Sequence, residues 1–309
     1  MGKASTTLLK GLDRAQAYLA ARQSADGGWG YAAGRQSYAE PTCYALLALA
    51  AGADSASRAE RESRALGWFT RRSQVGAIVH EDRAQRAVAS DHLDTWGTIL
   101  SFFALRSLRL GGELTEKYLR YLLHARGNPI DRAASEMLKL DGDLVAWSWA
   151  QGTASWVEPT AYAVLALKSQ GLGAHERVKA GETYLLDRAC YDGGWNYGNK
   201  EVLAVKLEAM PTVTAYALLA LQDYDRQHPV IVKSLDYLER ELAAHQSTLA
   251  LALGALCLKA YGQPVESLAV KLAARQEEDG SWRGNLHLTA LASLALQAAA
   301  TNRNVFKLA

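Results

Sequence analysis

Cysteine is scarce in this 309-residue chain, and its three copies lie far apart, at Cys43, Cys190 and Cys257. None belongs to a Cys-x-x-Cys pair or to a cysteine–histidine cluster, so the sequence predicts neither a disulfide framework nor a structural zinc site. Long apolar runs are also missing, since no stretch approaches the roughly 18 residues that a membrane-spanning helix needs. Residues 1–6 contain no apolar signal segment, and we therefore expect a soluble, cytoplasmic protein.

An excess of charge of either sign is missing as well. The 34 Lys and Arg residues nearly balance the 32 Asp and Glu residues, which gives no basic patch for nucleic acid, and we expect no nucleic-acid partner. Hydrophobic residues make up 49% of the chain and charged residues 21%, which excludes a disordered chain. No linker-like stretch interrupts the sequence, and we expect a single domain over residues 1–309.

Internal repeats organise the sequence. The segments that begin at Trp29 and Trp147 share Glu-Pro-Thr and then Leu-Ala-Leu at the same offsets. Asp-Gly-Gly-Trp occurs at residues 26–29 and again at 192–195, and Asp-Gly-Ser-Trp occurs at residues 279–282. Weaker copies, at residues 94–105 and 247–258, bring the number of units to six. The resulting period of roughly fifty residues is typical of arrays of helical pairs.

Each unit is predicted to contain two helices. The first is amphipathic, as in residues 8–19, and the second is apolar on every face, as in residues 44–51, and must be buried. We therefore predict an all-α fold, an α/α toroid of six helical hairpins with inner and outer rings of helices. The inner helices should begin near Pro41, Asp94, Pro159, Pro211, Ser247 and Leu288.

The repeats resemble a known motif. Gln23 followed by Gly27-x-Trp29 resembles the repeat of squalene–hopene cyclases and oxidosqualene cyclases, and related toroids form the β subunits of protein prenyltransferases. The match recurs at Gln276, Gly280 and Trp282, and again at residues 184–195, where Ala189 replaces the Gln. The resemblance covers essentially the whole chain. It implies that the repeat tryptophans, Trp29, Trp195 and Trp282, are structural.

The resemblance also indicates where an acid would lie. In those cyclases an Asp-x-Asp-Asp motif precedes Thr-Ala at the start of an inner helix, and its middle Asp protonates the substrate. This chain lacks the motif. When the repeats are aligned on the threonine at each inner-helix start, the position of that middle Asp is occupied by Glu40, Leu93, Glu158, Thr212, Gln246 and His287. Glu158 and Glu40 are therefore the catalytic candidates, and Glu158 is the closer to a proton donor because Glu-Pro-Thr-Ala stands where the cyclases have Asp-Asp-Thr-Ala. A glutamate before a proline at a helix start also stabilises the helix through a favourable interaction with the helix dipole, which requires no catalytic role.

Further residues are expected to line the same mouth of the toroid and to contact substrate. They are polar side chains near the inner-helix starts and aromatic side chains whose faces could stabilise a carbocation: His92, Asp94, Trp147, Trp149, Trp156, His245 and His287. Packing between helices would explain the aromatic residues equally well.

A metal site is not predicted. In prenyltransferase β subunits a histidine joins an Asp-x-Cys pair in binding zinc, and this chain has residues 245–248, His-Gln-Ser-Thr, where that pair should begin. Zinc-dependent prenyl transfer is therefore disfavoured, and we expect no metal and no cofactor.

Three functions stay open at this level. The first is a terpenoid-cyclase-like enzyme that cyclises a polyprenyl or isoprenoid substrate after protonation; full-length hopene cyclases have a second toroid, and its absence here counts against this function. The second is a non-catalytic protein that binds an isoprenoid or a partner protein. The third is a hydrolase or lyase acting on sugars, with Glu40 and Glu158 as paired carboxylates across the mouth. Peripheral membrane contact stays open, and the sequence does not predict the oligomeric state.

Overall fold

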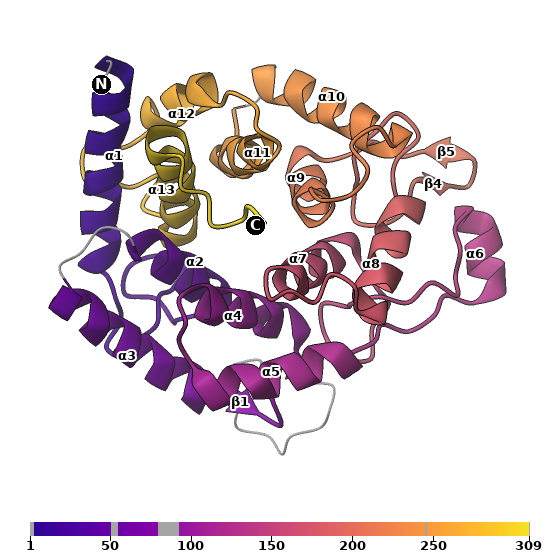
Figure 1. Cartoon of the computed structure of the whole chain (residues 1–309), viewed down its shortest axis with the longest axis horizontal. Coiled ribbons are helices and arrows are strands. Elements are labelled where there is room, and N and C mark those ends of the chain that lie inside the picture. The colour runs from indigo at the N-terminus through magenta and orange to yellow at the C-terminus, as the bar shows by residue number, and fades with distance from the viewer. Residues whose placement is uncertain (1–2, 51–54, 80–92, 245, 309) are drawn as a thin grey trace. The chain divides into compact units, whose positions relative to one another are not determined.

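The computed structural model describes residues 3–50, 55–79, 93–244 and 246–308. In these ranges the chain is mainly helical, as predicted (Figure 1). The helices are α1 (Lys3–Ala20), α2 (Ala39–Leu49), α3 (Ser55–Arg71), α4 (Thr95–Ser107), α5 (Gly112–His124), α6 (Arg132–Leu138), α7 (Val157–Lys168), α8 (Glu176–Asp187), α9 (Pro211–Ala220), α10 (Pro229–Ala244), α11 (Thr248–Ala260), α12 (Glu266–Ala273) and α13 (Leu286–Thr301).

Short strands lie in two of the connections between helices. Strands β1 (Ser73–Gln74), β2 (Ala77–Val79) and β3 (Leu93–Asp94) form one small sheet, in which β2 and β3 are antiparallel. Strands β4 (Glu201–Val202) and β5 (Val205–Lys206) form a hairpin. The fold is therefore all-α with minor strands. Helix α6 is an addition to the twelve helices predicted, and none of its residues is buried.

The inner-type helices begin within two residues of their predicted starts. Their apolar sequences also predict their burial correctly. Eleven of the twelve residues of α7 are buried, whereas the amphipathic α10 buries only five of sixteen. Alternation between the two kinds of helix thus follows from the hydrophobic pattern.

The described chain forms two compact units, each assembled from separated stretches. Unit 1 consists of Met1–Ser73, Leu100–Thr115 and His245–Phe306, and unit 2 of Gln74–Ile99, Glu116–Ala244 and Lys307–Ala309. Neither unit is a continuous half of the sequence. The single domain expected from the sequence stays a prediction.

Unit 1 brings the two ends of the chain together. Helix α13 packs against both α1 and α2, and α12 also contacts α1 (Figure 1). The first and last hairpins of the sequence are therefore neighbours, which places the start of α2 beside the start of α13.

Unit 2 is held together partly by a buried cation. Lys168, at the end of α7, donates to the carbonyl of Ala220 in α9 at 2.8 Å and pairs with Glu182 of α8 at 2.7 Å. It also contacts the carboxylate of Asp223. Because the Lys168 side chain is only 2% exposed, these partners compensate for its desolvation and fix α7 to α8 and α9.

The repeat tryptophans are structural, as the resemblance implies. The Trp29 indole donates to the carbonyl of Leu19 at the end of the preceding helix, and its backbone amide donates to the hydroxyl of Thr42, both at 2.9 Å. Trp195 and Trp282 make the same pair of contacts and, like Trp29, are completely buried. Each tryptophan therefore joins the end of one helix to the start of the next.

The repeat glutamines link successive outer helices. Gln23 donates to the carbonyls of Gly27 and of Arg61 in α3, and Gln276 does the same to Gly280 and to Gly11 in α1. The second of these links again connects the last repeat with the first.

The second repeat differs from its predicted alignment. The amide of Ile78 donates to the hydroxyl of Thr98 at 2.8 Å, the bond that Trp29 makes with Thr42. Thr98, and not Thr95, is therefore the repeat threonine of α4. The position equivalent to Glu40 is Trp96 rather than Leu93.

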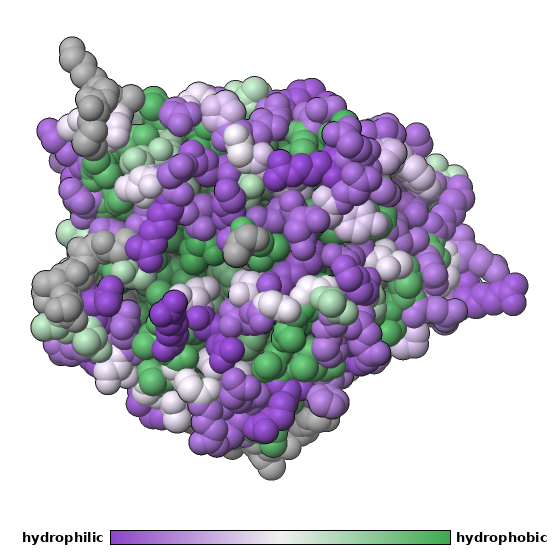
Figure 2. All heavy atoms as spheres, viewed as in Figure 1, coloured by the Kyte–Doolittle hydropathy of each residue, from purple (hydrophilic) through white to green (hydrophobic). Residues whose placement is uncertain are grey.

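Hydrophilic and hydrophobic side chains are interspersed on the face shown in Figure 2. Among the described residues, no helix has the length and apolar composition required to cross a bilayer.

Candidate active site

In unit 1 the starts of α2 and α13 bring together two of the predicted site residues. Glu40 is the second residue of α2, and His287 is the second residue of α13. The connection between α1 and α2 also lies here. The backbone carbonyl of Tyr31 accepts a hydrogen bond from the amide of Leu286 at 2.8 Å, and Ala32 forms an isolated antiparallel β-bridge with Asn285. The side chain of Asn285 caps α13 by accepting the amide of Leu288.

A chain of polar contacts results. The Tyr31 hydroxyl donates to Oε2 of Glu40 at 2.5 Å, and Oε1 of Glu40 lies 3.8 Å from Nε2 of His287. The Glu40 side chain is 19% exposed, so the carboxyl group lies partly out of water. Tyr31 satisfies one of its oxygens and His287 lies closest to the other.

His287 is held neutral by its surroundings. The residue is 8% exposed, and no hydrogen-bond partner within the described chain reaches its Nε2. Burial lowers the pKa of His287 because the charged imidazolium is disfavoured away from water, and the Glu40 carboxylate partly opposes this shift. A neutral imidazole beside a carboxyl group is therefore the state that the site favours.

Aromatic rings enclose this polar pair on one side. The ring of Tyr44 lies 5.0 Å from that of His287, and the ring of Phe306 lies 6.5 Å from that of Tyr44. Phe306 in turn stacks on Phe103 at 5.4 Å, with the two planes nearly parallel. Tyr44 and Phe306 are almost completely buried, so the wall behind His287 is apolar.

Unit 2 contains an aromatic cluster around Trp96. The Trp96 ring lies 4.8 Å from that of Trp149, 5.3 Å from that of Tyr162 and 6.2 Å from that of Tyr216. The amide of Trp96 also donates to the carbonyl of Trp149 at 3.2 Å. The contacts of Trp96 with the two tyrosines are edge-to-face, an arrangement that fixes the ring orientations.

Glu158 occupies the place in α7 that Glu40 occupies in α2. It is the second residue of its helix and half-buried, and Tyr162 lies one turn further along the same face. Trp156 is the N-cap residue of α7, is half-buried, and has its ring 6.5 Å from that of Tyr197. Glu158 and Trp156 therefore lie at the start of α7, the helix whose Tyr162 belongs to the Trp96 cluster.

Two of the predicted substrate contacts have structural roles. Trp147 is completely buried, and its indole donates to the carbonyl of Leu122 at 2.9 Å while its amide bonds to Thr160. It is a fourth structural tryptophan, and its contact with a ligand stays a prediction. Asp94 acts as a helix cap, since its Oδ1 accepts the amide of Gly97 at 2.8 Å. His92 and His245 lie outside the described residues.

Sequence reasoning missed several residues at these positions. Tyr44, Tyr162 and Tyr216 each follow the repeat threonine of their helix by two residues, which is a signal that the repeats already contain. Tyr31 could not be found in this way, because its contact with Glu40 depends on how the connection after α1 folds. In the described part of the chain, no three His, Cys, Asp or Glu side chains gather into a metal-binding group.

Solved structures share this fold. A protein from Actinoplanes has a TM-score of 0.67 at 17% identity, over 95% of this chain and 100% of that one. The type II terpene cyclase MstE from Scytonema has a TM-score of 0.65 at 14% identity, over 96% of this chain and 98% of that one. A glycosidase has a TM-score of 0.62 at 13% identity, over 97% and 99%. No family model and no curated protein matches the sequence.

These likenesses show a terpene-cyclase-like helical fold, in agreement with the sequence prediction. The match extends over nearly the whole solved MstE chain. At such low identity they do not show an activity.

Proposed function

We propose that this protein binds an isoprenoid chain and starts its cyclisation by protonation. The observation that carries the proposal is the contact of Glu40, at the start of α2, with both Tyr31 and His287. The Scytonema cyclase has been solved with geranylgeranyl dihydroxybenzoate as substrate and with merosterolic acid A as product. Its likeness in fold supports the same class of ligand here.

The proposed chemistry uses Glu40 as the acid. In its neutral form the carboxyl group gives its proton to one carbon of an alkene of the ligand; the π electrons form the new C–H bond, the other alkene carbon becomes the carbocation, and Glu40 is left as a carboxylate. The Tyr31 hydroxyl donates to Oε2 and thereby stabilises the carboxylate that remains. A neutral His287 places no positive charge beside the developing cation.

Aromatic side chains would then stabilise the cation. Rings near Glu40 are supplied by Tyr31 and Tyr44, all within unit 1. Glu158, at the equivalent helix start and on the same face as Tyr162, is the second candidate acid. Trp149 and Trp156 are proposed ligand contacts.

The test is turnover by the full chain with geranylgeraniol and geranylgeranyl diphosphate, followed by mass spectrometry of extracted products. We expect cyclised products from the native chain, loss of turnover in Glu40→Gln, and retained ligand binding in that variant. Glu241→Gln, an exposed change in α10, is the matched control and should keep full activity. Loss of turnover in Glu158→Gln but not in Glu40→Gln would show that Glu158 is the acid.

Other results would select the alternatives. Binding of geranylgeraniol without any product would favour a non-catalytic isoprenoid-binding protein, the function that the missing Asp-x-Asp-Asp motif supports. Hydrolysis of aryl glycosides that depends on both Glu40 and Glu158 would favour a sugar hydrolase. Either result would contradict the proposed cyclase.

Peripheral membrane contact is also a proposal. The β4–β5 hairpin supports it by exposing two apolar side chains, with Leu203 71% and Val205 62% exposed. Co-sedimentation of the chain with lipid vesicles, lost in a Leu203→Ser, Val205→Ser variant, would test it.

A further inference from the structure

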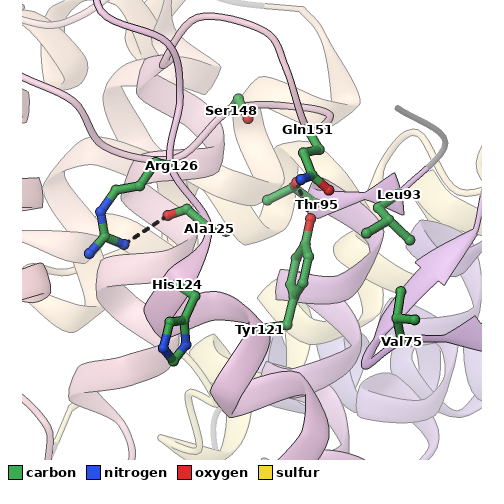
Figure 3. Close-up of a pocket in the computed structure, with 9 residues that line it drawn as sticks. All are labelled: Val75, Leu93, Thr95, Tyr121, His124, Ala125, Arg126, Ser148 and Gln151. Atoms are coloured by element: carbon green, nitrogen blue, oxygen red, sulfur yellow. Dashed lines mark hydrogen bonds between the residues drawn. The ribbon is translucent and has the colours of Figure 1, made fainter. Parts of the chain in front are cut away.

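Unit 2 contains a cavity that is separate from the residues assigned above. Its volume is about 480 Å³, within the range of small-molecule sites. It lies between the end of α5, the β3–α4 junction and the segment from Ser148 to Gln151. Its lining, drawn in Figure 3, consists of Val75, Leu93, Thr95, Tyr121, His124, Ala125, Arg126, Ser148 and Gln151.

The cavity has a basic side and an apolar side. In Figure 3, His124 and Arg126 lie to one side of the Tyr121 ring, and Val75 and Leu93 lie to the other. Among the described residues that line the cavity, none is acidic. The nearby carboxylate of Asp94 is bonded to the amide of Gly97 at the start of α4. The composition therefore suits a ligand with one negative and one apolar end.

Two hydroxyl groups, those of Tyr121 and Thr95, belong to residues that line the cavity. The hydroxyls of Tyr121 and Thr95 lie 2.8 Å apart, and Thr95 is almost completely buried. Burial raises the pKa of Tyr121, and the charge of Asp94 raises it further although the bond from Thr95 opposes this, so the phenol stays neutral and able to donate. Tyr121 thus combines a flat apolar ring with a donor in the middle of the cavity.

The basic groups retain capacity for a ligand. Arg126 uses Nη1 to bond the carbonyls of Leu123 and Ala125, which directs the guanidinium along the end of α5. His124 bonds the carbonyl of Arg120 through Nδ1 at 2.7 Å, and its Nε2 lies on the opposite edge of the ring. A carboxylate in the cavity could accept from the other guanidinium nitrogens.

The cavity lies in a repeat that departs from the common pattern. In this repeat Ile78 replaces the repeat tryptophan, and a small sheet replaces the short connection. On the rim, Val75 has a φ of 43° and is 80% exposed, a conformation that β-branched residues rarely adopt. Departures from local preference of this kind are concentrated at functional sites.

From these features we infer that the cavity is a binding site for a small organic anion with an apolar body. The anionic end would contact Arg126 and His124, and the apolar body would lie against Tyr121, Leu93 and Val75. This site is independent of the proposed isoprenoid chemistry, and its test does not rely on turnover.

The experiment compares three probes on the full chain by isothermal titration calorimetry and ligand-observed NMR. Benzoate has the charge and the apolar body, benzamide has the body alone, and inorganic phosphate has the charge alone. We expect benzoate to bind, with benzamide and phosphate about fivefold weaker or worse, the scale of one exposed ion pair. Equal binding of benzoate and benzamide, or no binding of benzoate, would overturn the inference.

Variants then locate the binding. Arg126→Gln should abolish the preference for benzoate over benzamide, whereas Arg132→Gln, on the exposed helix α6, should leave it unchanged. Ala125→Phe should fill the cavity and block the binding of benzoate and of benzamide. If Ala125→Phe lowers the melting temperature, Tyr121→Phe replaces it as the test. This variant removes only the hydroxyl and should weaken the binding of benzoate. Unchanged benzoate binding in Arg126→Gln and in these cavity variants would place the probe elsewhere and refute the site.

Discussion

The amide of Ile78 donates to the hydroxyl of Thr98, and that hydroxyl donates in turn to the carbonyl of Asp94 at 2.6 Å. Thr98 thereby joins β2 to α4 although no repeat tryptophan is present. Both residues are buried, with Ile78 3% exposed and Thr98 completely enclosed. The hydroxyl of the repeat threonine is therefore retained where the tryptophan is not.

Thr98→Val is expected to destabilise the fold more than Thr95→Val. The first change leaves the buried amide of Ile78 without a partner, which costs about 1–3 kcal/mol. The second removes a bond to the Tyr121 hydroxyl, which faces a cavity and can bond water instead, and should cost about 1 kcal/mol or less. Urea unfolding of both variants measures the difference. An equal or larger loss for Thr95→Val would restore the alignment based on Thr95.

The same pair of residues shows what the sequence could and could not predict. In four repeats a Trp and a Thr flank the connection, and the alignment of the sequence agrees with the structure. In the second repeat Ile78 occupies the place of the tryptophan, and Thr95 is the first residue of α4 whereas the repeat threonine is the fourth. Hydrophobic periodicity was sufficient for the helices, since it depends only on neighbouring positions.

The candidate site was predictable only in part. Glu40 and His287 were both selected from the repeat alignment, but their contact depends on packing between α2 and α13. Trp147 is completely enclosed and Trp149 is half-buried, and the alignment of Trp147 with the structural Trp29 was the signal in the sequence that separates the two.

Trp147→Ala should therefore reduce stability without a specific effect on ligands. It deletes a completely buried side chain together with the bond to Leu122, and the expected cost is about 3–5 kcal/mol. Trp149→Ala removes a partly exposed ring and should cost less, while weakening isoprenoid binding. Chemical denaturation and a binding titration on both variants provide the measurements. Normal stability with lost binding in Trp147→Ala would return Trp147 to the ligand site.

The repeat glycines are expected to be required by close helix packing. Gly280 has a φ of 91°, and a Cβ atom there would lie 2.5 Å from the carbonyl oxygen of Arg14 in α1. Gly262 has a similar φ of 83°, but a Cβ atom would meet nothing within 4 Å. Gly262→Ala should therefore cost about 1 kcal/mol, from backbone strain alone.

Gly280→Ala should cost more than Gly262→Ala because α1 must also move away. Thermal unfolding of the two variants isolates the packing contribution, since the strain is common to both. Equal losses would show that α1 adjusts freely, and would remove the close approach as the reason for this glycine.

The His287 environment predicts how stability depends on pH. An unperturbed histidine has a pKa of about 6.5, and burial lowers the pKa of His287 in the folded state. Above about pH 6.5 both the folded and the unfolded chain hold this histidine neutral, and no penalty arises. As the pH falls below that value, the unfolded chain binds a proton that the folded chain does not, so stability declines towards the folded-state pKa.

Two variants test this sign. His287→Gln should lose less stability than the native chain between about pH 8 and pH 5, because it removes the buried titrating group. Glu40→Gln should lower the pKa of His287 further, since the carboxylate that favours the imidazolium is gone, and Glu241→Gln should not change it. The pKa can be followed by NMR titration of the His287 ring proton. A pKa at or above the ordinary value in the native chain would show that His287 is protonated beside Glu40, and the neutral imidazole of the proposed mechanism would be wrong.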